Sequence, residues 1–478
     1  MSVNAETDAT SVQQPPPTRM TPRMKVILVV LLSAQFMLAV DFSILNVALP
    51  IIGEGLGFTL ANLQWITTSF ALCAAGFTLL FGRVADLFGR KRLFLGALAV
   101  LGISSLVGGF APTPEVLIAA RVFQGLATAA MTPAGLSLLT TSFPEGPLRD
   151  KALGLNGALM SAGFTSGAIL GGLLTDLLSW RWAFFINVPV VVVVLIVAPL
   201  VINDSRMNDR PKLDMPGALL VTGGLLAVVF GLTQAGEAGW GSTVALGSLA
   251  LGAVLLAAFY AVERKVAAPL VPLQVLGRRT VAWGNIAGLV AFLTETSLVF
   301  LLTLYLQNVL GFTPMAAGLS FAVLGLGTVL GGVFAPRVIG WTSAKSTLLI
   351  GGIVQAAATF ALLALGTDQA TMWLLLLGTF VGGVGNMFVI VGFMVTATSG
   401  LPDHEQGLAT GLATMTQQVG ITMGTPIMSA IANSAMVGAG VVAILDGLSV
   451  AIAANATIVL LGVLASAFFL RGKQKAAA

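Results

Sequence analysis

The sequence predicts an all-α integral membrane protein with fourteen transmembrane helices. Of its 478 residues, 57% are hydrophobic and only 9% are charged, too few charges to give a soluble globule a polar surface. Apolar runs of about 20 residues, the length that crosses a bilayer, recur along the whole chain. The basic residues gather in alternate gaps between these runs, as the positive-inside rule describes.

The fourteen apolar runs follow one another with short polar gaps. They lie near residues 25–49, 61–81, 93–111, 115–140, 152–178, 182–202, 213–234, 243–262, 281–303, 315–336, 346–366, 371–396, 408–433 and 450–470. If the N-terminus is cytoplasmic, 21 of the 23 lysines and arginines lie on the cytoplasmic side. We therefore expect both termini in the cytoplasm, with a disordered Pro-rich tail at 1–24 and a short tail at 471–478.

An internal repeat divides the chain into two halves. Several residues recur at an offset of 257 or 258, namely Gly154, Gly163 and Gly167 as Gly411, Gly420 and Gly424, and Gln124-Gly125 as Gly382-Gly383. The offset aligns the first apolar run with the ninth. We therefore expect parallel six-helix halves at 25–202 and 281–470, and a two-helix insertion with its linkers at 203–280.

The polar gap after the second run reads GRVADLFGRKR. A simple cytoplasmic loop would explain its basic residues but not its glycines and its acid. The stretch resembles the signature loop of the major facilitator superfamily, whose halves are related by an axis along the membrane normal, with the substrate at the midplane between them. The resemblance assigns a conformational gate to Gly82, Arg83, Asp86, Gly89, Arg90, Lys91 and Arg92.

Further motifs are similar to those of the fourteen-helix drug:proton antiporter branch. They are DFSILNVALP at 41–50, WRWAFFINVP at 180–189, LDMPG at 213–217 and YLQNVLGF at 305–312. The branch implies a monomeric exporter in the bacterial inner membrane that exchanges protons for hydrophobic or amphipathic drugs, including cationic ones, without a cofactor. The alternatives are a lipid or metabolite exporter of the same fold, and a membrane sensor or structural protein that does not transport.

Four glycines in the fifth run, Gly163, Gly167, Gly171 and Gly172, resemble the antiporter motif. Ala168 stands where the family usually has proline, which weakens the inference of export because the proline would bend this helix. The same glycines are also what close helix packing needs, since small residues four apart let backbones approach.

Three charged residues lie inside the predicted spans, where ionised groups cost about 2.5 to 3.5 kcal/mol and are often functional. Asp41 and Arg121 belong to the N-terminal half, and we expect them to pair; the alternative is a static structural ion pair. Glu295 has no basic partner in its half, so its carboxyl should be neutral or meet a cation. These three residues are the proton-coupling candidates, with a polar cavity wall as the alternative for Glu295.

The predicted cavity wall mixes aromatic, thioether and sparse polar groups, which suit bulky amphipathic ligands. Its residues are Phe36, Phe42, Trp65, Phe292, Phe300, Asn386, Met387 and Met394. Ordinary helix packing would explain each of them equally well.

The sequence lacks the residues that several other classes of protein need for their chemistry. Cys73 and His404 are the only residues of their types, so no disulfide, zinc site or Ser-His-Asp arrangement is expected. No phosphate-binding loop of the Walker type occurs. Because these catalytic arrangements are missing, we do not expect an enzyme. The basic residues are dispersed over eight segments, so we do not expect a nucleic-acid partner.

Overall fold

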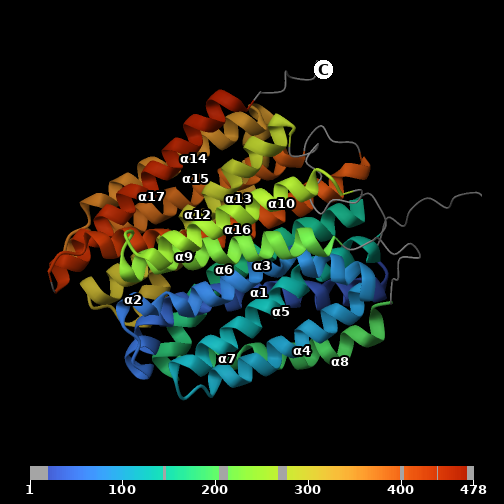
Figure 1. The fold of residues 1–478 in the computed structure, drawn as a ribbon, viewed down its shortest axis with the longest axis horizontal. Coiled ribbons are helices and arrows are strands. Elements are labelled where there is room, and N and C mark those ends of the chain that lie inside the picture. The colour runs from blue at the N-terminus through green and yellow to red at the C-terminus, as the bar shows by residue number, and fades with distance from the viewer. Residues whose placement is uncertain are drawn as a thin grey trace, which may run out of the picture.

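The computed structural model describes residues 20–143, 147–203, 214–266, 277–398, 403–438 and 440–470. The described part is almost entirely helical (Figure 1). Eleven of its helices are long and apolar enough to cross a membrane. This confirms an all-helical membrane protein.

The described residues of the first half form eight helices. They are α1 (Pro22–Leu56), α2 (Leu60–Leu63), α3 (Trp65–Phe88), α4 (Arg90–Gly109), α5 (Pro114–Ser142), α6 (Pro147–Leu177), α7 (Trp182–Phe185) and α8 (Asn187–Val201). α1 starts inside the tail predicted to reach residue 24, because Thr21 caps the helix and Pro22 suits its first turn. The sixth span is broken after Phe185, so α7 and α8 share it.

The remaining helices form the insertion and the second half. They are α9 (Met215–Ala238), α10 (Thr243–Glu263), α12 (Arg279–Leu304), the π-helix η1 (Tyr305–Val309), α13 (Pro314–Trp341), α14 (Ala344–Ala361), the 3₁₀ turns η2 (Leu362–Ala364) and η3 (Gln369–Thr371), α15 (Met372–Thr398), α16 (Asp403–Ala435) and α17 (Val441–Phe469).

Matching glycine contacts show the repeat in three dimensions. In the first half, a Cβ on Gly163 of α6 would lie 2.8 Å from the carbonyl oxygen of Phe36 in α1. In the second half, a Cβ on Gly420 of α16 would lie 2.7 Å from the carbonyl oxygen of Leu289 in α12. Phe36 and Leu289 are 253 residues apart, so the offset of 257 does not extend to the first helix of each half. The second half has four more residues between these helices.

The halves meet at one end of the bundle and diverge toward the other (Figure 1). The closed end is where α1, α6 and α16 finish and α13 begins, and its apolar core joins residues of both halves, such as Ile44, Ala168, Phe300 and Met428. The open end is where α1 begins and α17 finishes. Two separate apolar cores lie toward it, one in each half.

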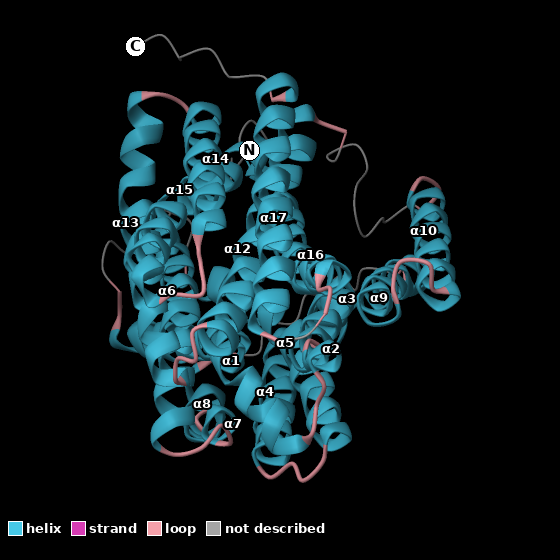
Figure 2. Ribbon diagram, turned by 90° about the vertical axis from the view of Figure 1, so that its left-hand side faces the viewer, coloured by secondary structure: helices cyan, strands magenta, loops and turns pink. Residues whose placement is uncertain are grey.

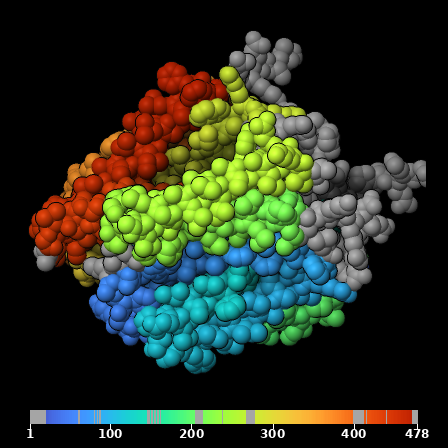
Figure 3. Space-filling view, in the orientation of Figure 1, coloured from blue at the N-terminus to red at the C-terminus, as the bar shows by residue number. Residues whose placement is uncertain are grey.

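The inserted helices cover one side of the boundary between the halves. α9 contacts α3 of the first half and α16 of the second, whereas α10 packs mainly on α9. Figure 2 shows α10 outermost, and Figure 3 shows the pair lying across the boundary between the blue and red halves. The Thr222 hydroxyl of α9 donates to the carbonyl of Gly76 in α3, and the Asn433 amide of α16 donates to the carbonyl of Gly236 in α9.

Candidate functional site

A buried charged cluster occupies the core of the first half. One guanidinium nitrogen of Arg121 lies 2.9 Å from the Asp41 carboxylate, and both side chains are at most 1% exposed. The pairing expected from the sequence is therefore present. The Arg121 Nε also donates to the backbone carbonyl of Ile66, and its guanidinium lies over the ring of Phe70 at 4.1 Å. Arg121 thus keeps favourable contacts in addition to Asp41.

Asp41 accepts two further hydrogen bonds from side-chain amides. The Gln124 amide donates to it at 3.2 Å and the Asn187 amide at 2.5 Å. Both amides also donate to the hydroxyl of Ser105 in α4. Three side chains, from α5 and α8, therefore donate to this carboxylate, and such a density of donors stabilises a buried anion. Sequence reasoning gave Gln124, Ser105 and Asn187 no role here, although Asn187 belongs to a quoted motif.

The second half has a neutral counterpart of this cluster. At the offset set by the glycine contacts, Asp41 corresponds to Thr294, whose hydroxyl accepts a hydrogen bond from the Gln355 amide at 3.1 Å. The Asn455 amide donates to the backbone carbonyl of Thr294 and to the hydroxyl of Ser297. The fold thus places hydrogen-bonded polar side chains at matching depths in both halves, but the bonded cluster contains charged residues only in the first half.

Glu295 lies next to Thr294 on α12 and is partly exposed. Its carboxylate makes no hydrogen bond or ion pair with any residue that the structure describes. The structure does not bring Glu295 into the Asp41 cluster.

A small cavity, of about 10 Å³, lies between the halves and is lined by α1, α3, α12 and α16. Its lining residues are Phe42, Asn46, Thr67, Thr68, Ala71, Thr296, Ile421, Thr422 and Thr425. Only Phe42 belongs to the predicted cavity wall. The ring of Phe42 also packs near that of Phe70, at 5.9 Å between centroids, and the Phe70 ring lies against the Arg121 guanidinium, so two aromatic rings connect the cavity wall with the charged cluster.

The other seven predicted wall residues pack elsewhere. Phe36 lies against Gly163, Trp65 against Phe230 of α9, Phe292 against Phe393, Phe300 in the core of the closed end, Asn386 against the carbonyl of Ala291, Met387 against Gly331, and Met394 at the edge of the second half's core. Their composition suits a cavity, but helix packing within each half takes most of them.

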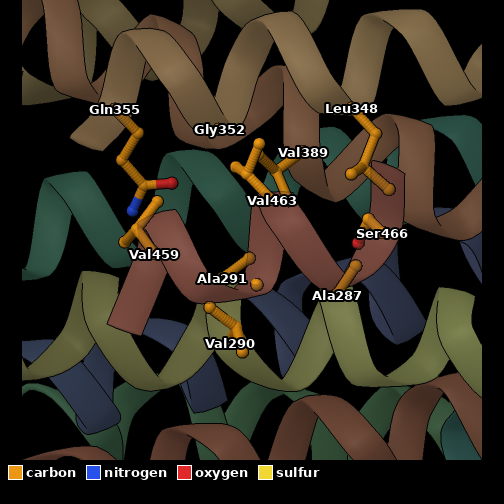
Figure 4. Close-up of a pocket in the computed structure, with 11 residues that line it drawn as sticks. Ala287, Val290, Ala291, Leu348, Gly352, Gln355, Val389, Val459, Val463 and Ser466 are labelled. Atoms are coloured by element: carbon orange, nitrogen blue, oxygen red, sulfur yellow. The ribbon is translucent and has the colours of Figure 1, made fainter. Parts of the chain in front are cut away.

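A second small cavity, of about 10 Å³, lies in the second half between α12, α14, α15 and α17 (Figure 4). Its wall is apolar except for Gln355 and Ser466. It does not reach the boundary between the halves, because all of its lining residues belong to the second half.

The predicted gate is only partly visible. Gly89 joins α3 to α4 with a φ of 99°, a conformation that favours glycine. The Lys91 ammonium donates to the carbonyls of Pro199 and Ile202 at the end of α8, so it binds within its own half. Gly82 lies near Pro133 of α5, and Arg90 and Arg92 begin α4. The side chains of Arg83 and Asp86 lie outside the described residues.

The glycines of the antiporter motif divide between two contacts. Cβ atoms on Gly163, Gly167 and Gly171 would meet α1 of the same half. A Cβ on Gly172 would instead lie 2.3 Å from the carbonyl oxygen of Pro314 in α13 of the other half. The sequence grouped all four in one motif, whereas the structure places Gly172, alone among them, at the contact between the halves. This contact forms although α6 has Ala168 in place of proline.

A sequence profile described as Major Facilitator Superfamily matches residues 31–425. The chain belongs to the major facilitator superfamily. This confirms the resemblance inferred from the signature loop, and the superfamily is one of transporters, not of enzymes. The fold of this chain agrees with that of a mutant form of the nucleoside transporter NupG. The TM-score is 0.63 at 11% sequence identity, and the match covers 93% of this chain and 100% of that chain.

Several members of the superfamily are similar over most of the chain. The puromycin resistance protein pur8 of Streptomyces alboniger is 39% identical over 85% of this chain and 82% of its own length. The cephamycin export protein CmcT of Amycolatopsis lactamdurans is 38% identical over 86% and 85%. The multidrug resistance protein Stp of Mycobacterium tuberculosis CDC 1551 is 28% identical over 83% and 73%.

Proposed function

We propose that this protein is a proton-coupled antiporter that exports amphipathic antibiotics by alternating access. The observation that carries the proposal is the Asp41–Arg121 pair, an ionisable couple buried beside a cavity at the boundary between the halves. Intramembrane charges are costly and often mark proton relays. The similar proteins named as resistance and export proteins support a drug as the substrate.

The same proposal includes fourteen spans. α3, α6 and α16 are 24, 31 and 33 residues long, which exceeds the length needed to cross a bilayer, and they add to the eleven apolar spans. The open end, where α1 begins and α17 finishes, then faces the cytoplasm because the basic residues lie there. In this proposal the open end makes this the inward-facing state of the cycle, and the membrane is a bacterial inner membrane.

Coupling follows from the partners of Arg121. When Asp41 is ionised, it neutralises the guanidinium and accepts bonds from Gln124 and Asn187. When Asp41 is protonated, Arg121 loses its counter-charge but keeps its contacts with the side-chain amide oxygen of Gln124, the backbone carbonyl of Ile66 and the Phe70 ring. Phe70 packs near Phe42 on the cavity wall. Proton binding and cavity shape are thereby linked through adjacent side chains, and this link shifts the access equilibrium.

Glu295 is the second acid in this proposal. Its carboxylate has no partner among the described residues, so it is available to a proton or to a cationic substrate. Replacing Glu295 by glutamine should reduce transport of cationic substrates more than that of neutral ones.

The test is substrate flux in proteoliposomes with an imposed pH gradient, read by dequenching of a fluorescent cationic dye. The wild type should move the dye against its gradient. Asp41→Asn should still bind the dye but should not accumulate it, because its side chain no longer ionises. Asp446→Asn is the matched control, since Asp446 of α17 is exposed and its replacement should leave flux unchanged. Flux by Asp41→Asn at the wild-type level would refute this coupling role.

A further inference from the structure

The π-helix η1 makes a side-chain hydrogen bond across the boundary between the halves. The side-chain amide of Gln307 in η1 donates to the backbone carbonyl of Val47 in α1 at 2.7 Å, although 260 residues separate the two in the sequence. Val47 is completely buried in the apolar core of the closed end. A carbonyl oxygen has two lone pairs, so Val47 can accept this bond and keep its place in the helix. The bond therefore joins the second half to the first where the two halves meet.

Tyr305, two residues before Gln307, fixes η1 to its own half. The Tyr305 hydroxyl donates to the backbone carbonyl of Gly366 at 2.7 Å and lies 3.3 Å from the hydroxyl of Thr371, and both partners belong to the connection between α14 and α15. Residues two apart on a helix point in nearly opposite directions, so Tyr305 faces the second half while Gln307 faces the first. A separation of the halves at the closed end would therefore break the Gln307 bond and leave the Tyr305 bonds intact.

The backbone of η1 is itself unusual. The N–H of Leu310 donates to the carbonyl of Tyr305, five residues earlier, at 3.1 Å. Such π-turns are rare and frequently mark functional sites. At the offset of 253 set by the glycine contacts, Gln307 corresponds to Glu54 of the first half, which is exposed on the regular helix α1. The bond across the boundary is therefore a feature of the second half and not of the repeat.

We propose that Gln307 is a positioning residue for transport, whose bond to Val47 stabilises the access state with a closed end. The proposal rests on the alternating access proposed above. When the closed end opens, α1 and η1 move apart with their halves, so the bond is present in one access state and absent in the other. An interaction made in only one of two states shifts the equilibrium between them. Water replaces both partners once the end opens, so the shift is that of one net hydrogen bond.

The test measures distances between spin labels in the purified full-length protein without substrate. Labels at Leu177 and Val437, exposed positions on opposite halves, report the closed end, with Cys73 replaced by serine. Gln307→Met removes the donor at nearly constant length, whereas Gln307→Lys keeps a donor of similar reach. Asn308→Leu is the matched control, because Asn308 is the next residue of η1 and its amide makes no hydrogen bond with a described residue.

Gln307→Met should raise the ratio of long to short distances about 3- to 10-fold, the value of one hydrogen bond. Gln307→Lys should keep the ratio within twofold of the wild type, and Asn308→Leu should leave it unchanged. A Gln307→Met distribution that matches the wild type would overturn the proposal. A Gln307→Lys shift as large as that of Gln307→Met would also overturn it, because packing and not the donor would then be responsible. Dye flux in a pH gradient is measured separately, so failure of this role is distinguishable from failure of the transport function.

Discussion

Replacing Gly172 by alanine should shift the protein away from the state with a closed end. The new Cβ would lie 2.3 Å from the Pro314 carbonyl oxygen and 3.2 Å from Cα of Gly318. Both partners are backbone atoms of α13, so α6 and α13 must separate by about 1 Å to restore ordinary contact. Overpacking of this kind costs about 1 to 3 kcal/mol. A cost of about 2 kcal/mol changes the equilibrium between access states roughly 30-fold.

The matched control is Gly171→Ala. Its Cβ would lie 2.0 Å from the carbonyl oxygen of Ile44, which belongs to the same half. The clash is at least as severe, but it strains α6 against α1 and does not act between the halves. This variant should therefore lower thermal stability while leaving the balance between access states near that of the wild type.

Electron-electron distance measurements between spin labels would detect the shift. The only native cysteine, Cys73, is replaced by serine, and cysteine pairs are introduced at exposed positions on opposite halves. Leu177 with Val437 reports the closed end, and Phe88 with Trp341 the open end. Gly172→Ala should lengthen the first distance and shorten the second. Distributions that superimpose on those of the wild type would refute the assignment of Gly172 to the contact between access states.

Further predictions concern the two helix caps, the gate and the insertion. Lys345 donates to the carbonyls of Ala467 and Leu470 at the end of α17, as Lys91 does at the end of α8. Lys91→Met and Lys345→Met should therefore each lower the free energy of unfolding by about 1 kcal/mol. Thermal unfolding should show similar losses of stability for both variants, and the spin-label distances should stay unchanged. Asp86→Asn should slow transport at normal expression, because Asp86 belongs to the predicted conformational gate, and an unchanged rate would contradict that role. Cysteines along 215–263 should label at rates that substrate does not alter, and protection of several positions would place the insertion on the substrate path.

The sequence alone determined the class of the protein. Apolar runs of membrane length, the repeated glycines and the signature loop predicted a helical member of the major facilitator superfamily, and these features are read from spacing along one helix at a time. Asp41 and Arg121 were also found this way, because a charge within an apolar run is conspicuous and two opposite charges in one half are expected to pair.

Only the tertiary structure decided which side chains share a site. The predicted aromatic and methionine wall failed to converge because the direction of a side chain depends on the rotation of its helix, which apolar runs do not encode when both faces are hydrophobic. Asn187 and Ser105 belong to the same hydrogen-bonded cluster as Asp41, although 82 residues separate Asn187 from Ser105 in the sequence. Gly171 and Gly172 also contact different helices because of the direction in which each residue points. Adjacent residues point about 100° apart on a helix, so one meets its own half and the other meets the opposite half.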